Sequence, residues 1–209
     1  MVLGGGAYLI FKGGGVAAIL PGGPDNTIPP WDFTVAKTAA VPTSKTEASK
    51  LAGSAGQVVS GAAATMKTLY TEAFLDPANW RGGSYDEVWP TFEQAASTQA
   101  QTDAAVLTLG STAGDAYEKV QPSKSKISFR VLFDSKDAPK TVVAIVKFTA
   151  IGIGKDGART AFVSSGQYFL RDTGDGWKVF SYSVKRADHP AKPKPGPSGN
   201  SPTPSAVAS

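Results

Sequence analysis

Residues 127–186 contain four segments in which apolar and polar residues alternate, separated by three short turns rich in Gly, Pro and Asp. In the first segment, from Ile127 to Phe133, an apolar side chain recurs at every second position. This period of two is typical of a strand with one buried face, and short turns join successive strands as hairpins. The sequence therefore predicts an antiparallel meander whose strands span residues 127–133, 141–151, 159–171 and 177–186.

The residues before these strands have the period of a helix. Apolar residues recur three and four positions apart from Leu51 to Phe74, which predicts a long helix that Asp76-Pro77 ends. We expect an α+β fold, with N-terminal helices packed on a strongly curved antiparallel meander of four or more strands that forms a cone. The long helix would fill the concave side of this sheet.

Local signals refine this expectation. Ser84 and Glu87 have the three-residue spacing of a capping box, which predicts a second helix that bends at Pro90 and continues to about residue 105. Gly166 lies inside the third expected strand, where glycine is typical of a bulge or a sharp bend.

The two ends of the chain differ from the middle in composition. Residues 1–20 are apolar and glycine-rich, and residues 21–43 contain several prolines and glycines, which indicates an extended linker. The folded domain is expected over residues 44–188. Residues 189–209 contain repeated prolines with Lys, Gly and Ser, which predicts a disordered tail.

Residues 1–20 allow three interpretations. The run is close to the roughly 20 apolar residues of a membrane helix, but it contains Lys12 and many glycines. It is the outer end of a membrane anchor truncated upstream, a poor signal sequence, or a flexible arm. We favour the anchor, because an apolar run of this kind has no obvious reason to lie in water. The domain is then extracytoplasmic and tethered to the cytoplasmic membrane, with secretion as the alternative.

Charge is distributed unevenly along the chain. Residues 44–118 contain four Lys/Arg and nine Asp/Glu, a balance of −5, and residues 119–186 contain thirteen and five, a balance of +8. The simpler interpretation is acidic helices packed beside a basic sheet, and the more specific one is a basic sheet face that meets an anionic surface. The net charge of +4 is too small to argue for nucleic acid.

The side chains that most enzymes use are scarce. The chain has no cysteine, which excludes disulfides and thiolate chemistry, and its single histidine, His189, lies in the expected tail. Carboxylates such as Asp86 and Glu93 fit a solvated helix face better than a paired acid and base. We therefore predict no catalytic residue, no cofactor and no metal site.

Six aromatic residues remain as candidates for a site. Trp80, Tyr85, Trp89 and Phe92 are placed to close the mouth of the cone, and core packing is the competing interpretation. If the cone is hollow, it forms an apolar ligand pocket with Tyr168 or Tyr182 as the polar contact.

The final hairpin carries a resemblance. The segments Gly166-Gln-Tyr-Phe-Leu-Arg171, Asp175-Gly-Trp-Lys-Val179 and Tyr182-Ser-Val-Lys-Arg186 resemble the last strands of nuclear-transport-factor-2-like (cystatin-like cone) domains. Leu107-Thr-Leu-Gly110, and Asp76-Pro77 with Trp80, are similar to single-span extracytoplasmic proteins of actinobacteria such as the Mce-associated membrane proteins. The resemblance implies a domain that assembles or stabilises a membrane complex, with no established catalytic role and with dimers formed through the sheet.

Three functions follow from these observations. The first is a non-enzymatic interaction or assembly module of a bacterial envelope complex, which binds a protein partner or a second copy of itself through the sheet. The second is a binding protein for a small apolar ligand or lipid held inside the cone. The third is a cone-fold isomerase or dehydratase, which requires an ionisable side chain deep in the cavity.

Overall fold

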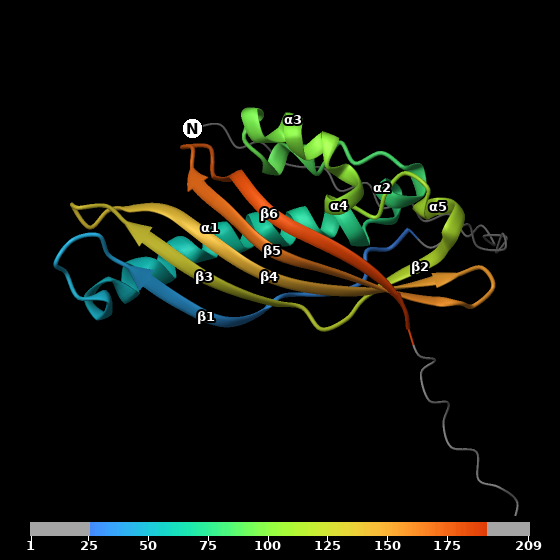
Figure 1. Cartoon of the computed structure of the whole chain (residues 1–209), viewed down its shortest axis with the longest axis horizontal. Coiled ribbons are helices and arrows are strands. Elements are labelled where there is room, and N and C mark those ends of the chain that lie inside the picture. Colours follow the sequence, from blue (N-terminus) through green and yellow to red (C-terminus); the bar gives the residue numbers. More distant parts are fainter. Residues whose placement is uncertain (1–25, 192–209) are drawn as a thin grey trace, which may run out of the picture.

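The computed structural model describes residues 26–191. These residues form an α+β fold in which helices pack on a curved, mostly antiparallel sheet (Figure 1), which confirms the predicted fold class. The helices are η1 (Ala48–Leu51), α1 (Ala52–Tyr70), η2 (Thr71–Leu75), α2 (Pro77–Gly82), η3 (Trp89–Thr91), α3 (Gln94–Thr102), α4 (Ala104–Leu107) and α5 (Ala113–Ala116). The strands are β1 (Thr34–Val41), β2 (Tyr117–Pro122), β3 (Lys126–Phe133), β4 (Pro139–Gly154), β5 (Arg159–Asp172) and β6 (Trp177–Pro190).

The sheet contains the predicted meander and two further strands. Its order is β1-β3-β4-β5-β6, and β3 to β6 are consecutive antiparallel neighbours. The long strand β4 pairs with β3 along one half and with β2 along the other. β1 runs parallel to β3 at the edge of the sheet.

The two faces of the sheet have different surroundings. In β4, alternate residues from Val142 to Ala150 are buried in the main core, against the helices, and the residues between them point to the other face. Figure 1 shows α1 lying along one face of β3 to β6, while the other face carries no helix. We call this second face, formed by the outward positions of β1, β3, β4, β5 and β6, the open face.

Aromatic side chains fill the space between α1 and the sheet. Phe148 of β4 lies at the centre, with its ring 4.8 Å from that of Tyr70, 5.2 Å from Phe74 and 5.4 Å from Trp31. Small residues let α1 lie close to the sheet. At Gly61, an added Cβ atom would lie 2.6 Å from Cδ1 of Trp177 in β6. Such packing leaves the interior of the curved sheet filled rather than hollow along α1.

The expected linker is wrong for residues 34–41, which form β1 and pair with β3. The chain before β1 is also part of the fold, because Trp31 Nε1 donates to Thr71 Oγ1 at 3.0 Å and its ring packs on Phe148. Thr71 opens the π-helical turn η2, in which Asp76 N bonds to Thr71 O at 2.8 Å. The domain therefore begins well before residue 44.

The C-terminal boundary also moves. β6 continues to Pro190, with His189 opposite Ala161 in β5, so residues 189 and 190 belong to the sheet and not to the expected tail. The expected anchor (residues 1–20) and residues 192–209 of the tail lie outside the described residues.

Two local predictions are wrong. Ser84 does not begin a helix, because its Oγ bonds to Asp86 Oδ2 at 2.8 Å and the next α-helix starts only at Gln94. Of the two alternatives for Gly166, the bulge is wrong, since β4 and β5 pair without a register shift across it, and the bend stays a prediction. The irregularity between β5 and β6 falls instead between Phe169 and Leu170.

Candidate functional site

The six aromatic candidates do not form one site. Trp89, Phe92, Tyr182 and Tyr168 follow one another with ring centroids 5.7 to 6.5 Å apart. Phe92 and Tyr168 are buried and the other two are half-buried, so this row packs the helices onto β5 and β6. Tyr85 is buried elsewhere, with its hydroxyl donating to Gly110 O at 2.9 Å, and Trp80 lies beside Arg81.

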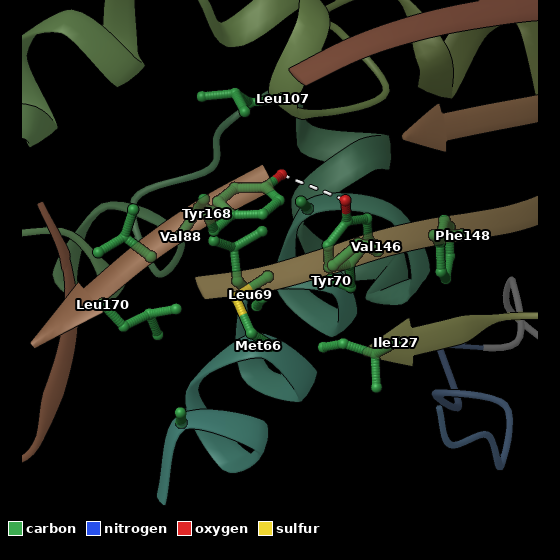
Figure 2. Packing of buried hydrophobic residues seen from close by; sticks show 14 of the residues in the cluster. Met66, Leu69, Tyr70, Val88, Leu107, Ile127, Val146, Phe148, Tyr168 and Leu170 are labelled. Carbon is green, nitrogen blue, oxygen red and sulfur yellow. Dashed lines mark hydrogen bonds between the residues drawn. The ribbon is translucent and has the colours of Figure 1, made fainter. Parts of the chain in front are cut away.

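The deepest polar side chains belong to a closed hydroxyl cluster. Tyr70 Oη lies 2.9 Å from Ser164 Oγ and 3.2 Å from Tyr168 Oη, and the second contact is dashed in Figure 2. All three side chains are 0% exposed. Burial raises the pKa of Tyr70 to about 12 and that of Tyr168 well above 10. Because these phenols stay protonated and no solvent reaches them, they stabilise the core by satisfying one another.

A second polar pair joins β6 to the helical layer. Tyr182 Oη donates to Asp103 Oδ2 at 2.7 Å. This hydrogen bond lowers the pKa of Asp103, and burial, reinforced by the carboxylate, raises the pKa of Tyr182. Neither group changes its protonation near neutral pH, so the pair lacks the poised acid or base that proton-transfer catalysis uses.

A groove of about 690 Å³ lies beside Trp80, between α2 and β2. Pro77, Trp80 and Val120 give it an apolar wall, and Arg81 and Lys119 lie at its sides. Trp80 is 1% exposed, and its Nε1–H finds no acceptor among the described residues. A buried donor without a partner costs about 1–3 kcal/mol, so this side of the groove is less stable than a fully satisfied core.

The open face carries a group of exposed basic side chains that we call the basic cluster: Lys37, Lys126, Arg130, Lys147 and Lys185. These residues come from β1, β3, β4 and β6 and point away from the helices. Within the described residues, none of them forms an ion pair. The basic cluster is therefore a patch of uncompensated positive charge.

The register aligns part of the basic cluster in one row. Lys126 lies opposite Lys147, Lys147 opposite Ser165, and Ser165 opposite Lys185. With about 4.8 Å between neighbouring strands, this row extends roughly 14 Å across β3 to β6. Like charges placed directly opposite each other destabilise a sheet, so the Lys126–Lys147 pair favours the approach of an anion.

The strands that form this face contribute few acidic residues, and the carboxylate of Glu93 lies at its border, where it pairs with Arg171. The strands β1, β3, β4, β5 and β6 contain only Asp172 and Asp188 as acids. Asp172 ends β5, and Asp188 lies opposite the buried Phe162 on the helix side, where it pairs with Arg186. Most of the negative charge in the described residues thus lies on the helices and turns, and the remaining strand acid is Glu118 of β2.

Apolar side chains border the basic cluster. Phe169 and Phe180 lie on the open face with ring centroids 6.3 Å apart, and the Arg171 guanidinium lies 5.1 Å from the Phe180 ring. Val143 lies between Arg130 and Phe169 in the register and is 7% exposed, although it is outside the main core. The open face thus combines cations with a small aromatic patch.

A shallow hollow of about 410 Å³ lies on the open face between β5 and β6. Ser165, Gln167, Ser183 and Lys185 contribute polar groups to it, and Phe169 lines it as well. The strands approach closely here, because a Cβ on Gly166 would lie 2.1 Å from Ser183 O. The hollow therefore offers two hydroxyls, an amide and an ammonium group to a ligand that arrives from the open face.

The residues of the basic cluster were not singled out from the sequence. The signal that could have found them was the +8 balance of residues 119–186. Combined with the alternation of the strands, that balance places most of the surplus cations on the polar side of the sheet.

Comparison with known proteins gives no matching family model and no matching curated protein. Within residues 26–191, no helix is both long and apolar enough to span a membrane. The same residues contain no group of three or more His, Asp or Glu side chains placed to hold a metal ion.

Proposed function

We propose that this protein is a non-enzymatic interaction module of a bacterial cell envelope. It is tethered to the outer side of the cytoplasmic membrane through its N-terminal segment and binds an acidic component of an envelope complex through the open face. The observation that carries the proposal is the basic cluster, whose five cations have no ion pair among the described residues. Complementary charge across an interface steers association and selects the partner.

The composition of the open face supports a binding role. A sheet face that only met water needs no aromatic patch, yet Phe169 and Phe180 lie beside the cations. Aromatic and arginine side chains are enriched at protein interfaces. Phe169 shares a register row with Val143 and Arg130, and the Phe180 ring lies under the Arg171 guanidinium, an arrangement expected of a contact surface.

The charge also bears on self-association. In a symmetric dimer the same patch of each subunit meets its copy. Pairing two open faces would bring the five cations of one subunit against the five of the other. We therefore favour an acidic partner over the homodimer through the sheet.

The experiment compares two doubly substituted full-length chains in the bacterium that encodes the protein. In Lys147→Glu/Lys185→Glu the charge of the open face is reversed at two positions, and Lys45→Glu/Lys50→Glu is the matched control, because both lysines are exposed and lie outside the sheet. Native gels of envelope fractions should show the wild-type chain and the control in a large assembly, and the open-face variant outside it. If both variants stay in the assembly, the proposed surface is wrong.

A second function is favoured by the groove beside Trp80. Its apolar wall and its volume of about 690 Å³ suit a small apolar ligand. Native mass spectrometry of the gently purified chain should then show a co-purifying lipid or similar molecule, and Trp80→Phe, which removes the Nε1–H and shrinks the apolar wall, should weaken its retention. A chain that carries no such molecule would count against this function.

A further inference from the structure

We infer that the acidic component bound by the open face is the headgroup layer of an anionic phospholipid bilayer. The hollow between β5 and β6 would receive one lipid phosphate. This inference rests on the proposed function, because it uses the same surface. It adds the chemical class of the partner and a second contact with the membrane, distinct from the N-terminal segment.

Charge complementarity is the first argument. Four of the five cations are lysines, which are compact, hydrated charges on flexible stems, and the row Lys126–Lys147–Ser165–Lys185 spreads them across four strands. A single compact anion is held best by cations that converge on one point. A bilayer of mobile anionic lipids can instead place one headgroup opposite each cation.

The hollow supplies the second argument. Ser165 lies between Lys147 and Lys185 in the register, and Ser183 lines the same hollow. Two hydroxyl donors and the ammonium group of Lys185, with Lys147 beside them in the register, provide the charge-assisted hydrogen bonds that phosphate oxygens accept. The open side of the hollow faces away from the helices, which is the direction from which a membrane surface would approach.

The aromatic patch is the third argument. Phe169 lines the hollow and packs against Phe180 beside it, so apolar rings stand next to the phosphate-binding groups. Amphipathic helices that combine Lys or Arg with Phe bind at the boundary between headgroups and acyl chains, and the open face presents the same combination of side chains. An acidic protein partner would use the same cations, and the experiment below separates it from the bilayer.

The test is a flotation assay of the purified full chain with vesicles. One set contains phosphatidylcholine alone and the other phosphatidylcholine mixed with phosphatidylglycerol. Binding supplied by the apolar residues 1–20 is common to both sets, so the preference for phosphatidylglycerol measures the open face. We expect this preference at about 0.1 M salt and its loss at about 1 M, where the Debye length falls from about 10 Å to about 3 Å.

Substitutions locate the effect. Each cation near an anionic membrane strengthens binding about fivefold, so Lys147→Gln/Lys185→Gln should bind phosphatidylglycerol vesicles about 30-fold more weakly. Lys45→Gln/Lys50→Gln removes the same charge outside the sheet and should bind like the wild-type chain. Inorganic phosphate in a calorimeter should give no saturable binding, because it engages the hollow alone and not the remaining cations.

Three results would overturn the inference: equal binding to both vesicle types, equal loss in the two double variants, or saturable binding of inorganic phosphate without preference for phosphatidylglycerol. If the vesicles show no preference while the envelope assembly still depends on Lys147 and Lys185, the bilayer is not the partner and the proposed function stands. If the assembly is also insensitive to these lysines, both proposals fail.

Discussion

Two phenylalanines on opposite faces of the sheet test most directly whether one face is packed against the helices and the other is open. Phe148 is 0% exposed and contacts four aromatic rings on the helix-covered face. Phe148→Ala should lower the free energy of unfolding by about 3–5 kcal/mol, as expected for a large ring removed from a packed core. Phe169 is half-buried on the open face and packs mainly on Phe180, so Phe169→Ala should cost about 1 kcal/mol.

Urea unfolding, followed by circular dichroism and tryptophan fluorescence, measures both values. With a urea dependence of about 2 kcal/mol/M, Phe148→Ala should move the midpoint by about 2 M and Phe169→Ala by about 0.5 M. Equal shifts, or a larger shift for Phe169→Ala, would mean that the face without helices is as tightly packed as the other. The assignment of an open face, and the proposals built on it, would then be refuted.

Three further outcomes follow from the same packing. Gly166→Ala should disrupt the pairing of β5 with β6, because its Cβ would lie 2.1 Å from Ser183 O, and amide hydrogen exchange should rise along β6 rather than stay at the wild-type level. Trp31→Ala should cost about 2–3 kcal/mol in urea unfolding, since Trp31 packs on Phe148; a negligible loss would support the linker interpretation. Stability should fall between pH 10 and pH 12, because the unfolded chain releases the phenolic proton that folded Tyr70 retains up to about pH 12, and Tyr70→Phe should flatten this dependence.

The sequence predicted those helices and strands that bury one face, because burial of one face leaves a regular apolar pattern in the sequence. The period-two pattern predicted β3 to β6, and the apolar stripe predicted α1. Both predictions are confirmed, because the apolar face of the sheet and the apolar stripe of α1 are buried against each other. β1 was missed because Thr34–Val41 is rich in alanine, largely exposed and flanked by prolines, so its strand conformation depends on pairing with β3. A strand that tertiary pairing stabilises leaves little signal in its own residues.

The site was less predictable than the fold. The aromatic residues chosen from the sequence are mostly core, because side chains such as Tyr168 and Phe92 fill space wherever helices meet a sheet. The basic cluster depends on register, and register is set by pairings between strands far apart in the sequence. Counting charges along the chain could show a surplus of lysine but could not show that Lys126, Lys147 and Lys185 share one row.

The parallel strand β1 has a consequence for biosynthesis. Its partner β3 is translated only after all the helices, so Thr34 emerges from the ribosome long before Lys126, the residue beside which it will lie. Until then the edge of β1 is unpaired and the ring of Trp31 has no Phe148 to cover it. Pairing between such distant segments slows folding and exposes unpaired strand edges to other chains, so the nascent protein should depend on a chaperone until β4 is complete.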